Sequence, residues 1–174
     1  MRITTVAVPG FALGVAIMAA NCQAASAVAT ASATVLAPIA IAKSADLSFG
    51  RFAPGTGGSV TVSTSGVRVA GNTILSATDS SATAAKFEVS GDPAASYDIT
   101  IVASTALNDG AAHSMTLVTC SDLSMANTTS GNVASGTLSA TGTQSLFVGG
   151  TLKVDAAQLA GRYTGNIAVT VEYN

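Results

Sequence analysis

Charged side chains are scarce in this chain. They make up 9% of its 174 residues, against about 25% in typical soluble proteins. The Lys and Arg residues stand singly along the sequence, and the formal net charge is −2. Because binding to nucleic acid needs clustered cations that neutralise phosphates, we expect no nucleic-acid partner.

Side chains that usually carry catalysis are also few. The chain has one histidine, His113, and two cysteines, Cys22 and Cys120. No nucleophile elbow and no pair of carboxylates accompanies His113, and these residues fall short of a usual zinc ligand set. The acids lack the spacing of a calcium loop, and no glycine-rich phosphate loop opens a helix. We therefore expect no enzyme, no metal site and no cofactor, with Cys120 a buried small hydrophobe.

The first residues have the layout of an export signal. Arg2 precedes an apolar stretch from Ile3 to Ala20 that helix breakers interrupt, and small residues with Ala-x-Ala spacing follow. This layout is typical of a secretory signal peptide, whereas a membrane-spanning helix needs about 20 predominantly apolar residues. We expect residues 1–27 to be a signal peptide, cleaved after Ala24 or Ala27, and the mature protein to have no transmembrane segment.

Cys22 offers a different interpretation of the leader, because bacterial lipoproteins are cleaved just before a cysteine at this place. Ala19 and Asn21 differ from the residues that such signals have there, so we expect cleavage without lipidation. Loss of the leader leaves Cys120 as the single cysteine in an oxidising compartment. The mature domain then has no internal disulfide, and packing must stabilise it.

Beyond the leader, apolar residues recur with a period of two in short runs, which clusters of Gly, Ser, Asn and Asp separate. This pattern predicts antiparallel strands. Asn108-Asp109-Gly110 predicts a turn, and Gly149-Gly150 predicts a bulge or bend within a strand. The clearest strands are expected over residues 59–63, 73–77, 86–91, 97–103, 114–120, 145–154 and 166–173, with a weaker one over 133–138.

The mature chain, about 147 residues from Val28 to Asn174, has the size of one domain. Short strands at spacings near ten residues favour a sandwich. We predict an all-β fold, an immunoglobulin-like antiparallel β-sandwich. Residues 28–42 are expected to form an N-terminal arm or first strand, and residues 43–174 the sandwich domain.

The final segment alternates in the same way. Ile167, Val169, Val171 and Tyr173 share one face, Tyr173 is penultimate, and Gly161 is fourteenth from the end. This layout resembles the terminal strand of chaperone–usher pilus subunits, which a periplasmic chaperone recognises. The resemblance implies that these residues form the wall of a groove and a chaperone-facing edge.

The other end of the chain is compatible with the same resemblance. Val35, Ala37, Ile39 and Ile41 alternate after a run of small residues from Val28 to Thr34. In pilus-like fibres each sandwich lacks one strand, and the N-terminal arm of the next subunit supplies it. The resemblance implies that these four residues form the donated strand. The alternative is that they are the first strand of their own domain.

Four short motifs resemble an uncharacterised family of exported Gram-negative proteins and spore coat protein U. They are Asp46-Leu47-Ser48-Phe49-Gly50, Gly149-Gly150-Thr151-Leu152-Lys153-Val154, Gly161-Arg162-Tyr163-Thr164-Gly165 and the closing Val169-Thr170-Val171-Glu172-Tyr173. The resemblance runs from about Ala33 to Asn174 and implies the sandwich fold. One feature departs from many pilus subunits: the single cysteine of the mature chain cannot form the disulfide that they have.

These observations predict a secreted structural subunit of a pilus-like or other cell-surface assembly, joined by β-strand donation. We expect it to be secreted through the periplasm to the cell surface or the extracellular space. Its expected partners are other copies of itself or a periplasmic chaperone. One alternative is a self-contained monomeric sandwich that binds a carbohydrate or a protein through its loops, although the chain has no Trp for a sugar platform. A second is a secreted hydrolase built around His113.

Overall fold

The computed structural model describes residues 24–78, 81–103 and 106–174. The chain divides into two units, Met1–Thr34 and Val35–Asn174. In the first unit, residues 24–34 have no regular secondary structure and are exposed. Cys22 and most of the predicted signal peptide lie outside the described residues.

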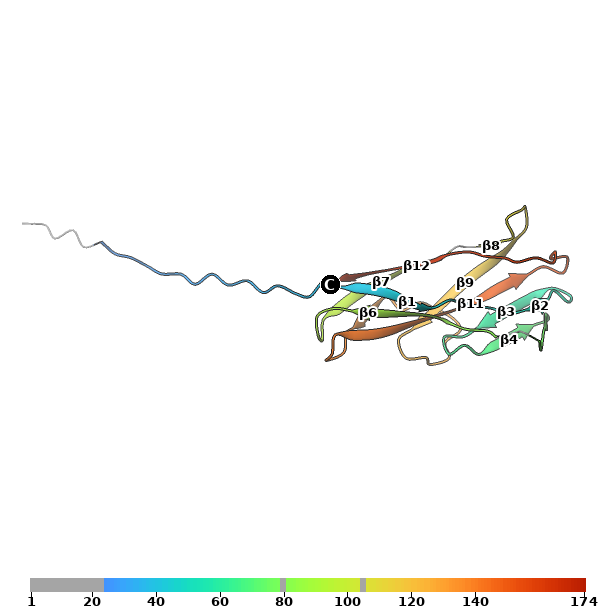
Figure 1. Ribbon diagram of the computed structural model, residues 1–174, viewed down its shortest axis with the longest axis horizontal. Helices are drawn as coiled ribbons and strands as arrows, with labels where there is room; N and C mark the ends of the chain where they lie inside the picture. Colours follow the sequence, from blue (N-terminus) through green and yellow to red (C-terminus); the bar gives the residue numbers. More distant parts are fainter. Residues whose placement is uncertain (1–23, 79–80, 104–105) are drawn as a thin grey trace, which may run out of the picture. The chain divides into compact units, whose positions relative to one another are not determined.

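The second unit is built from strands (Figure 1). None of the described residues is helical, so none belongs to a helix long and apolar enough to cross a membrane. The strands are β1 (Ala40–Ala45), β2 (Phe52–Ala53), β3 (Gly58–Val62), β4 (Arg68–Gly71), β5 (Ile74–Leu75), β6 (Ala85–Ser90), β7 (Ser96–Ala103), β8 (Ala106–Asn108), β9 (Ser114–Asp122), β10 (Ser135–Thr137), β11 (Thr143–Val154) and β12 (Ile167–Tyr173).

The strands form two layers. The larger sheet has the order β1-β6-β11-β3-β4, and β9 pairs with β11 and carries β8. The second sheet has the order β10-β7-β12, and β2 and β5 form a small separate pair. Every pairing between named strands is antiparallel. The predicted all-β antiparallel sandwich is therefore confirmed.

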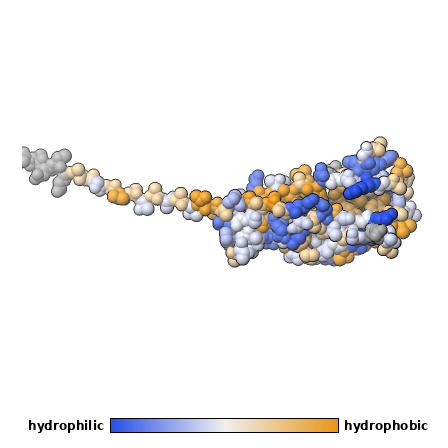
Figure 2. Space-filling model, in the orientation of Figure 1, coloured by the Kyte–Doolittle hydropathy of each residue, from blue (hydrophilic) through white to orange (hydrophobic). Residues whose placement is uncertain are grey.

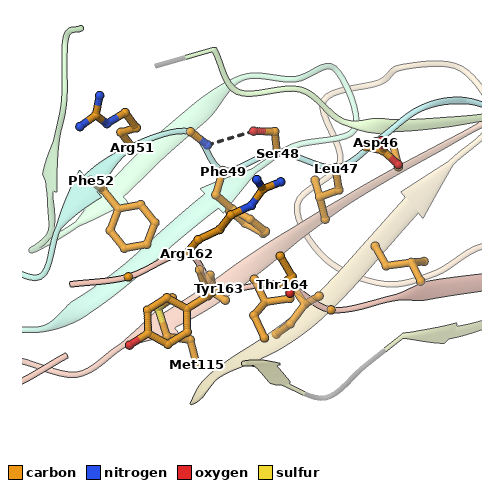
Figure 3. Close-up of a pocket in the computed structure, with 18 of the residues that line it drawn as sticks. Asp46, Leu47, Ser48, Phe49, Arg51, Phe52, Met115, Arg162, Tyr163 and Thr164 are labelled. Carbon is orange, nitrogen blue, oxygen red and sulfur yellow. Dashed lines mark hydrogen bonds between the residues drawn. The ribbon is translucent and has the colours of Figure 1, made fainter. Parts of the chain in front are cut away.

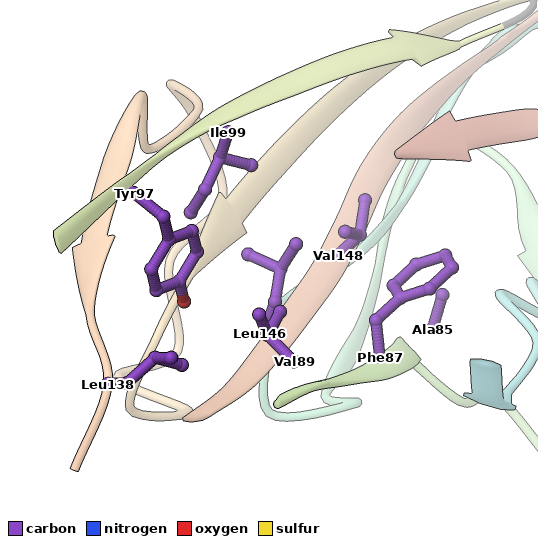
Figure 4. Packing of buried hydrophobic residues seen from close by; sticks show 8 residues of the cluster. All are labelled: Ala85, Phe87, Val89, Tyr97, Ile99, Leu138, Leu146 and Val148. Atoms are coloured by element: carbon purple, nitrogen blue, oxygen red, sulfur yellow. The ribbon is translucent and has the colours of Figure 1, made fainter. Parts of the chain in front are cut away.

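Alternating side chains of the two sheets meet in the core. Tyr97 and Ile99 of β7 point toward Leu146 and Val148 of β11 (Figure 4). All four are less than 7% exposed, whereas Asp98, between the two β7 residues, is exposed. The period of two thus separates a core face from a solvent face, as strand geometry requires.

A second buried cluster continues the core toward the other end of the sandwich. Its members come from β3, β9, β11 and the segment after β1, and Val60, Leu117, Leu152 and Phe49 are among them. With no disulfide among the described residues, burial of these apolar side chains is the main source of stability.

The double glycine lies where β11 changes its neighbour. One side of β11 pairs with β9, while the other side pairs with β6 over residues 143–148 and with β3 over residues 150–154. A Cβ on Gly149 would overlap the carbonyl oxygen of Val62. A side chain here would push β3 away from β11, so the chain needs glycine where the partner changes.

Each of the seven strands expected from clear alternation has a counterpart in β3, β5, β6, β7, β9, β11 or β12. The weaker expected strand corresponds to β10. Alternation did not indicate β2, β4 or β8, each of four residues or fewer, because so short a run shows too few repeats. The predicted boundary between the N-terminal arm and the sandwich domain, between residues 42 and 43, falls inside β1. The chain divides into its two units between Thr34 and Val35.

Candidate functional site

A groove opens the sandwich between two segments that are distant in sequence. One wall is the end of β1 with the chain that follows it, residues 43–54, and the other is residues 158–167, which lead into β12 (Figure 3). The cavity has a volume of about 1050 Å³. Its floor is made of core side chains: Ala85, Phe87, Met115, Leu117 and Leu152.

β12 is the strand on one side of this gap, and it is an edge strand. Among the described strands it pairs with β7 alone. Ile99 of β7 is 6% exposed, but Val171, directly opposite on the same face, is half-buried. Ile167, Val169 and Tyr173 are half-buried as well. The core-facing row of β12 is therefore covered on the β7 side and left open on the other.

β1 borders the gap on the other side, and it too is an edge. It pairs with β6, and no described strand pairs with its second edge. Ile41 is half-buried, whereas Val89, its partner on β6, is fully buried. Figure 2 shows apolar surface over the region of β1 and β12. The groove lies between the end of β1 and the start of β12, and each of these strands has one unpaired edge to which a further strand can add.

The backbone groups that face the gap can be identified from the register. The N–H of Asn174 donates to the carbonyl of Ser96 at 3.3 Å, and hydrogen-bonded pairs in an antiparallel ladder fall on every second residue. Ala168, Thr170 and Glu172 therefore direct their backbone groups toward β7. The N–H and C=O groups of Ile167, Val169, Val171 and Tyr173 point away from β7, toward the gap.

Tyr173 closes the gap at one end. Its hydroxyl donates to the carbonyl oxygen of Ala37 at 2.8 Å and accepts a hydrogen bond from the N–H of Asp92 at 2.6 Å. Gly91 has no room for a Cβ, which would overlap the same hydroxyl. The chain just before β1 is thereby held against the end of β12, and the groove opens only toward the opposite end of both strands.

Both walls of the groove are held in place. The guanidinium of Arg68 donates to the carbonyls of Phe49 at 3.0 Å and Arg51 at 3.3 Å, which secures the first wall. On the second wall, Thr164 exchanges two backbone hydrogen bonds of 2.8 Å with Asn108 at the end of β8. These contacts form the groove in the absence of an occupant, so binding would not have to order its walls.

The rim carries two arginine side chains. Arg51 on the first wall and Arg162 on the second are exposed (Figure 3). Neither guanidinium forms an ion pair within the part of the chain that the structure describes. Lys43 differs, because it forms an ion pair with Asp46 at 2.6 Å.

The structure separates the four residues predicted as the donated strand. Val35 is 93% exposed and Ala37 is exposed. Ile39 and Ile41 pack against the core of their own domain, and Ile41 lies in β1. Because Tyr173 binds the carbonyl of Ala37, only the chain before Ala37 is available to a neighbour without breaking contacts of its own domain.

The residues predicted for the second wall do lie together. Ile167, Val169, Val171 and Tyr173 form one row on β12, and Gly161 lies in the segment that leads into it and lines the groove. Sequence reasoning missed the first wall, residues 43–54, and the floor. The motif around Phe49 was visible as a family feature, but the contacts that make it a groove wall are long-range.

His113 ends the loop of residues 109–113 that joins β8 to β9, and Asp109 and Gly110 of the predicted turn lie in this loop. Its Nδ1 is 2.7 Å from Oδ2 of Asp109. A backbone hydrogen bond from Ala111 and the contact with His113 lower the pKa of the Asp109 carboxyl. Within the described residues this pair has no hydroxyl or thiol hydrogen-bonded to it, and the contact links the two ends of the loop.

Cys120 is fully buried, and its thiol donates to the carbonyl of Thr128 at 3.4 Å. Burial raises the pKa of this thiol, which keeps it in the protonated, unreactive form. No group of three or more His, Cys, Asp or Glu residues that could hold a metal ion occurs among residues 24–78, 81–103 and 106–174.

Asp122 is a buried carboxylate that organises a loop. It accepts hydrogen bonds from the Thr64 hydroxyl at 2.5 Å and from the N–H groups of Ser124 at 2.8 Å and Ala126 at 3.0 Å. Burial raises the pKa of Asp122, but these hydrogen bonds outweigh it and leave the pKa lowered. Because both carboxylate oxygens accept hydrogen bonds from the protein itself, this cluster is structural.

A second, shallower depression of about 400 Å³ lies on the outer face of the larger sheet. Glu88, Gln144, Ser145 and Phe147 are among its lining residues. The ammonium group of Lys86 lies 5.7 Å from the centre of the Phe147 ring, so this aromatic face is already occupied.

Comparison with known proteins gives a family for the chain. No curated protein and no solved structure matches it significantly. One family model, described as "Domain of unknown function (DUF4402)", matches residues 39–173, which begin just before β1 and include all of β12. This match covers well over half of the 174 residues, and the chain therefore belongs to the DUF4402 family.

Proposed function

We propose that the protein is a secreted structural subunit of a cell-surface assembly, in which the segment before β1 of one copy fills the groove of another. The observation that carries this proposal is the groove between the end of β1 and the segment that leads into β12, two strands that each have one unpaired edge. Such a groove leaves backbone groups and core side chains without partners, and an added strand satisfies both.

The segment before β1 has the properties of an added strand. Residues 24–34 are exposed and outside regular secondary structure. Ala29, Ala31, Ala33 and Val35 alternate with polar residues and share one face when the chain is extended. Ser32 and Thr34 fall on the opposite face. We assign the face with the three alanines and Val35 to the groove, and the face with Ser32 and Thr34 to solvent.

The length of this segment is sufficient. The nine residues from Val28 to Leu36, which remain after loss of the leader, span roughly 30 Å when extended, and the seven residues of β12 span roughly 23 Å. The segment can therefore cover all of β12 and the groove mouth beyond it. The pilus-like resemblance of β12 and the leader expected over residues 1–27 support assembly outside the cytoplasm.

The test is a denaturing gel of the full-length protein from the periplasm or cell surface, run with and without boiling. Wild type is expected to give a ladder of oligomers that boiling collapses, because strand-exchanged pairs dissociate slowly. Ala31→Asp should give a monomer, since it places a charge in the apolar groove. The matched control, Ser32→Asp, should keep the ladder.

A single wild-type band with and without boiling would contradict the proposal. Equal ladders from Ala31→Asp and Ser32→Asp would contradict the assignment of the donated face. The first result would favour the alternative, a monomeric sandwich that binds a ligand through its surface, and the depression beside Phe147 is the place to examine for it.

A further inference from the structure

The groove admits a donated strand in one direction. β1 runs from the end that Tyr173 closes toward the open end, and β12 runs the opposite way. At the closed end the acceptor's own Ala37, held by Tyr173, blocks the exit. The chain that connects the strand to its own domain must therefore leave through the open end. The donated strand is then antiparallel to β12, which is also the more stable pairing.

This direction determines which parts of two copies meet. In the donor copy, Ala37 lies at the closed end of its own sandwich, beside Asp92 and Tyr173. A strand that ends near Val35 in the acceptor's groove leaves about two residues before that end of the donor. The closed end of one copy is thus brought to the open groove mouth of the next.

The closed end is acidic. Asp98 of β7 and Glu172 of β12 lie directly opposite each other on the exposed face, and Asp92 lies in the turn that Tyr173 holds. Like charges in directly opposed positions destabilise a sheet. Neither Asp98 nor Glu172 has a cationic partner within the described residues. We call Asp92, Asp98 and Glu172 the acidic end.

The open end has an excess of positive charge. Lys43 and Asp46 pair with each other there, Asp109 lies beside Gly161, and Arg51 and Arg162 stand on the two walls of the groove mouth without an ion pair among the described residues. We call these two arginines the basic rim. Residues 167–172 of β12 alone separate it from Glu172 by roughly 17 Å. This exceeds the Debye length of about 8 Å at physiological ionic strength, so the acidic end of a subunit does not neutralise its own rim.

We infer that subunits stack head to tail, with the acidic end of one copy, Asp92, Asp98 and Glu172, seated on the basic rim, Arg51 and Arg162, of the next. This inference rests on the proposed strand donation and adds the contact that orients and steers it. The contact joins two different surfaces, so repetition of it extends a fibre instead of closing a dimer. Complementary charge of this kind raises the rate of association and its salt dependence.

The test is charge reversal with assembly rate as the readout, measured on full-length protein by the appearance of the heat-labile ladder at low and high salt. R51E/R162E and D98K/E172K should each slow assembly about tenfold at low salt and less at high salt. The quadruple variant, in which both surfaces are reversed, should recover the wild-type rate. The control K153E changes an exposed β11 cation outside the groove and should assemble normally.

The outcomes separate this inference from the proposed function. A wild-type ladder whose rate is unchanged in both double variants overturns the head-to-tail contact and leaves strand donation standing. Slow assembly of R51E/R162E without recovery in the quadruple variant also overturns the head-to-tail contact, because the basic rim then binds an anionic group other than the acidic end. Absence of any wild-type ladder overturns strand donation and the contact together.

Discussion

Asp122 is a buried carboxylate that several hydrogen bonds hold in place. Its carboxylate accepts three hydrogen bonds of 3.0 Å or less while 8% exposed. Two of them come from backbone N–H groups in a loop where Met125 and Asn127 adopt positive φ. The carboxylate compensates this local strain, so the loop over Cys120 depends on its charge.

Asp122→Asn is predicted to lower the free energy of unfolding by about 2 kcal/mol at pH 7, because buried N–H and O–H donors lose a charged acceptor. The folded-state pKa of Asp122 lies below its unfolded value of about 3.9. Its stabilisation is thus present above that value and is lost as the pH falls through the folded pKa. Urea unfolding at a series of pH values measures this.

The stability difference between wild type and Asp122→Asn should shrink in acid. Asp98→Asn is the matched control, because Asp98 is exposed and faces another acid; it should not lower stability. A variant at Asp122 that is as stable as wild type at pH 7 would show that the loop is held by other contacts.

Tyr173 has two structural roles, one carried by its ring and one by its hydroxyl. In the sequence it completes an alternating row, and it does face the core. In the structure its hydroxyl also joins Ala37 to Asp92. No local pattern indicates this second role, because its two partners lie 136 and 81 residues away.

At the scale of elements, the distinguishing feature is the pair of unpaired edges. β12 pairs with β7 and β1 with β6, and no described strand bridges the gap between them. Natural proteins usually protect such edges with charge, bulges or a covering segment. β1 has an irregularity between Lys43 and Ala45, but β12 has regular register along its whole length. β12 is therefore the edge best suited to accept a strand.

Amide hydrogen exchange should show this edge directly. In monomeric Ala31→Asp, the N–H groups of Val169 and Val171 are predicted to exchange at least about a hundredfold faster than those of Ala168 and Thr170, which bond to β7. In assembled wild type both sets should be slow. Measurement by NMR or mass spectrometry compares them residue by residue. Protection of Val169 and Val171 in the monomer would mean that the edge is already covered.

At the scale of the whole molecule, the proposal requires each copy to be both donor and acceptor. The two roles lie on different parts of the chain and can be removed separately. Ala31→Asp disables the donated segment and leaves the groove, whereas Val169→Lys disables the groove and leaves the segment. Val169 faces the gap, while its neighbour Thr170 is exposed.

Each variant alone is predicted to stay monomeric, and a mixture of the two is predicted to give a one-to-one complex. In the mixture, the intact segment of Val169→Lys can fill the intact groove of Ala31→Asp, and no second pairing is possible. Size-exclusion chromatography with light scattering measures the product. Thr170→Lys, the control for Val169→Lys, should assemble like wild type. Absence of a complex in the mixture would mean that the segment folds back on its own domain.

The sequence by itself determined the all-β class, the positions of most long strands and the core face of β7 and β12, because a period of two follows from the local geometry of an extended chain. It indicated the row from Ile167 to Tyr173 for the same reason. Only the tertiary structure decided that Ile39 and Ile41 belong to their own core, and that the chain after β1 lies across a groove from Arg162. Strand order and free edges depend on pairings between distant residues, which no local pattern records.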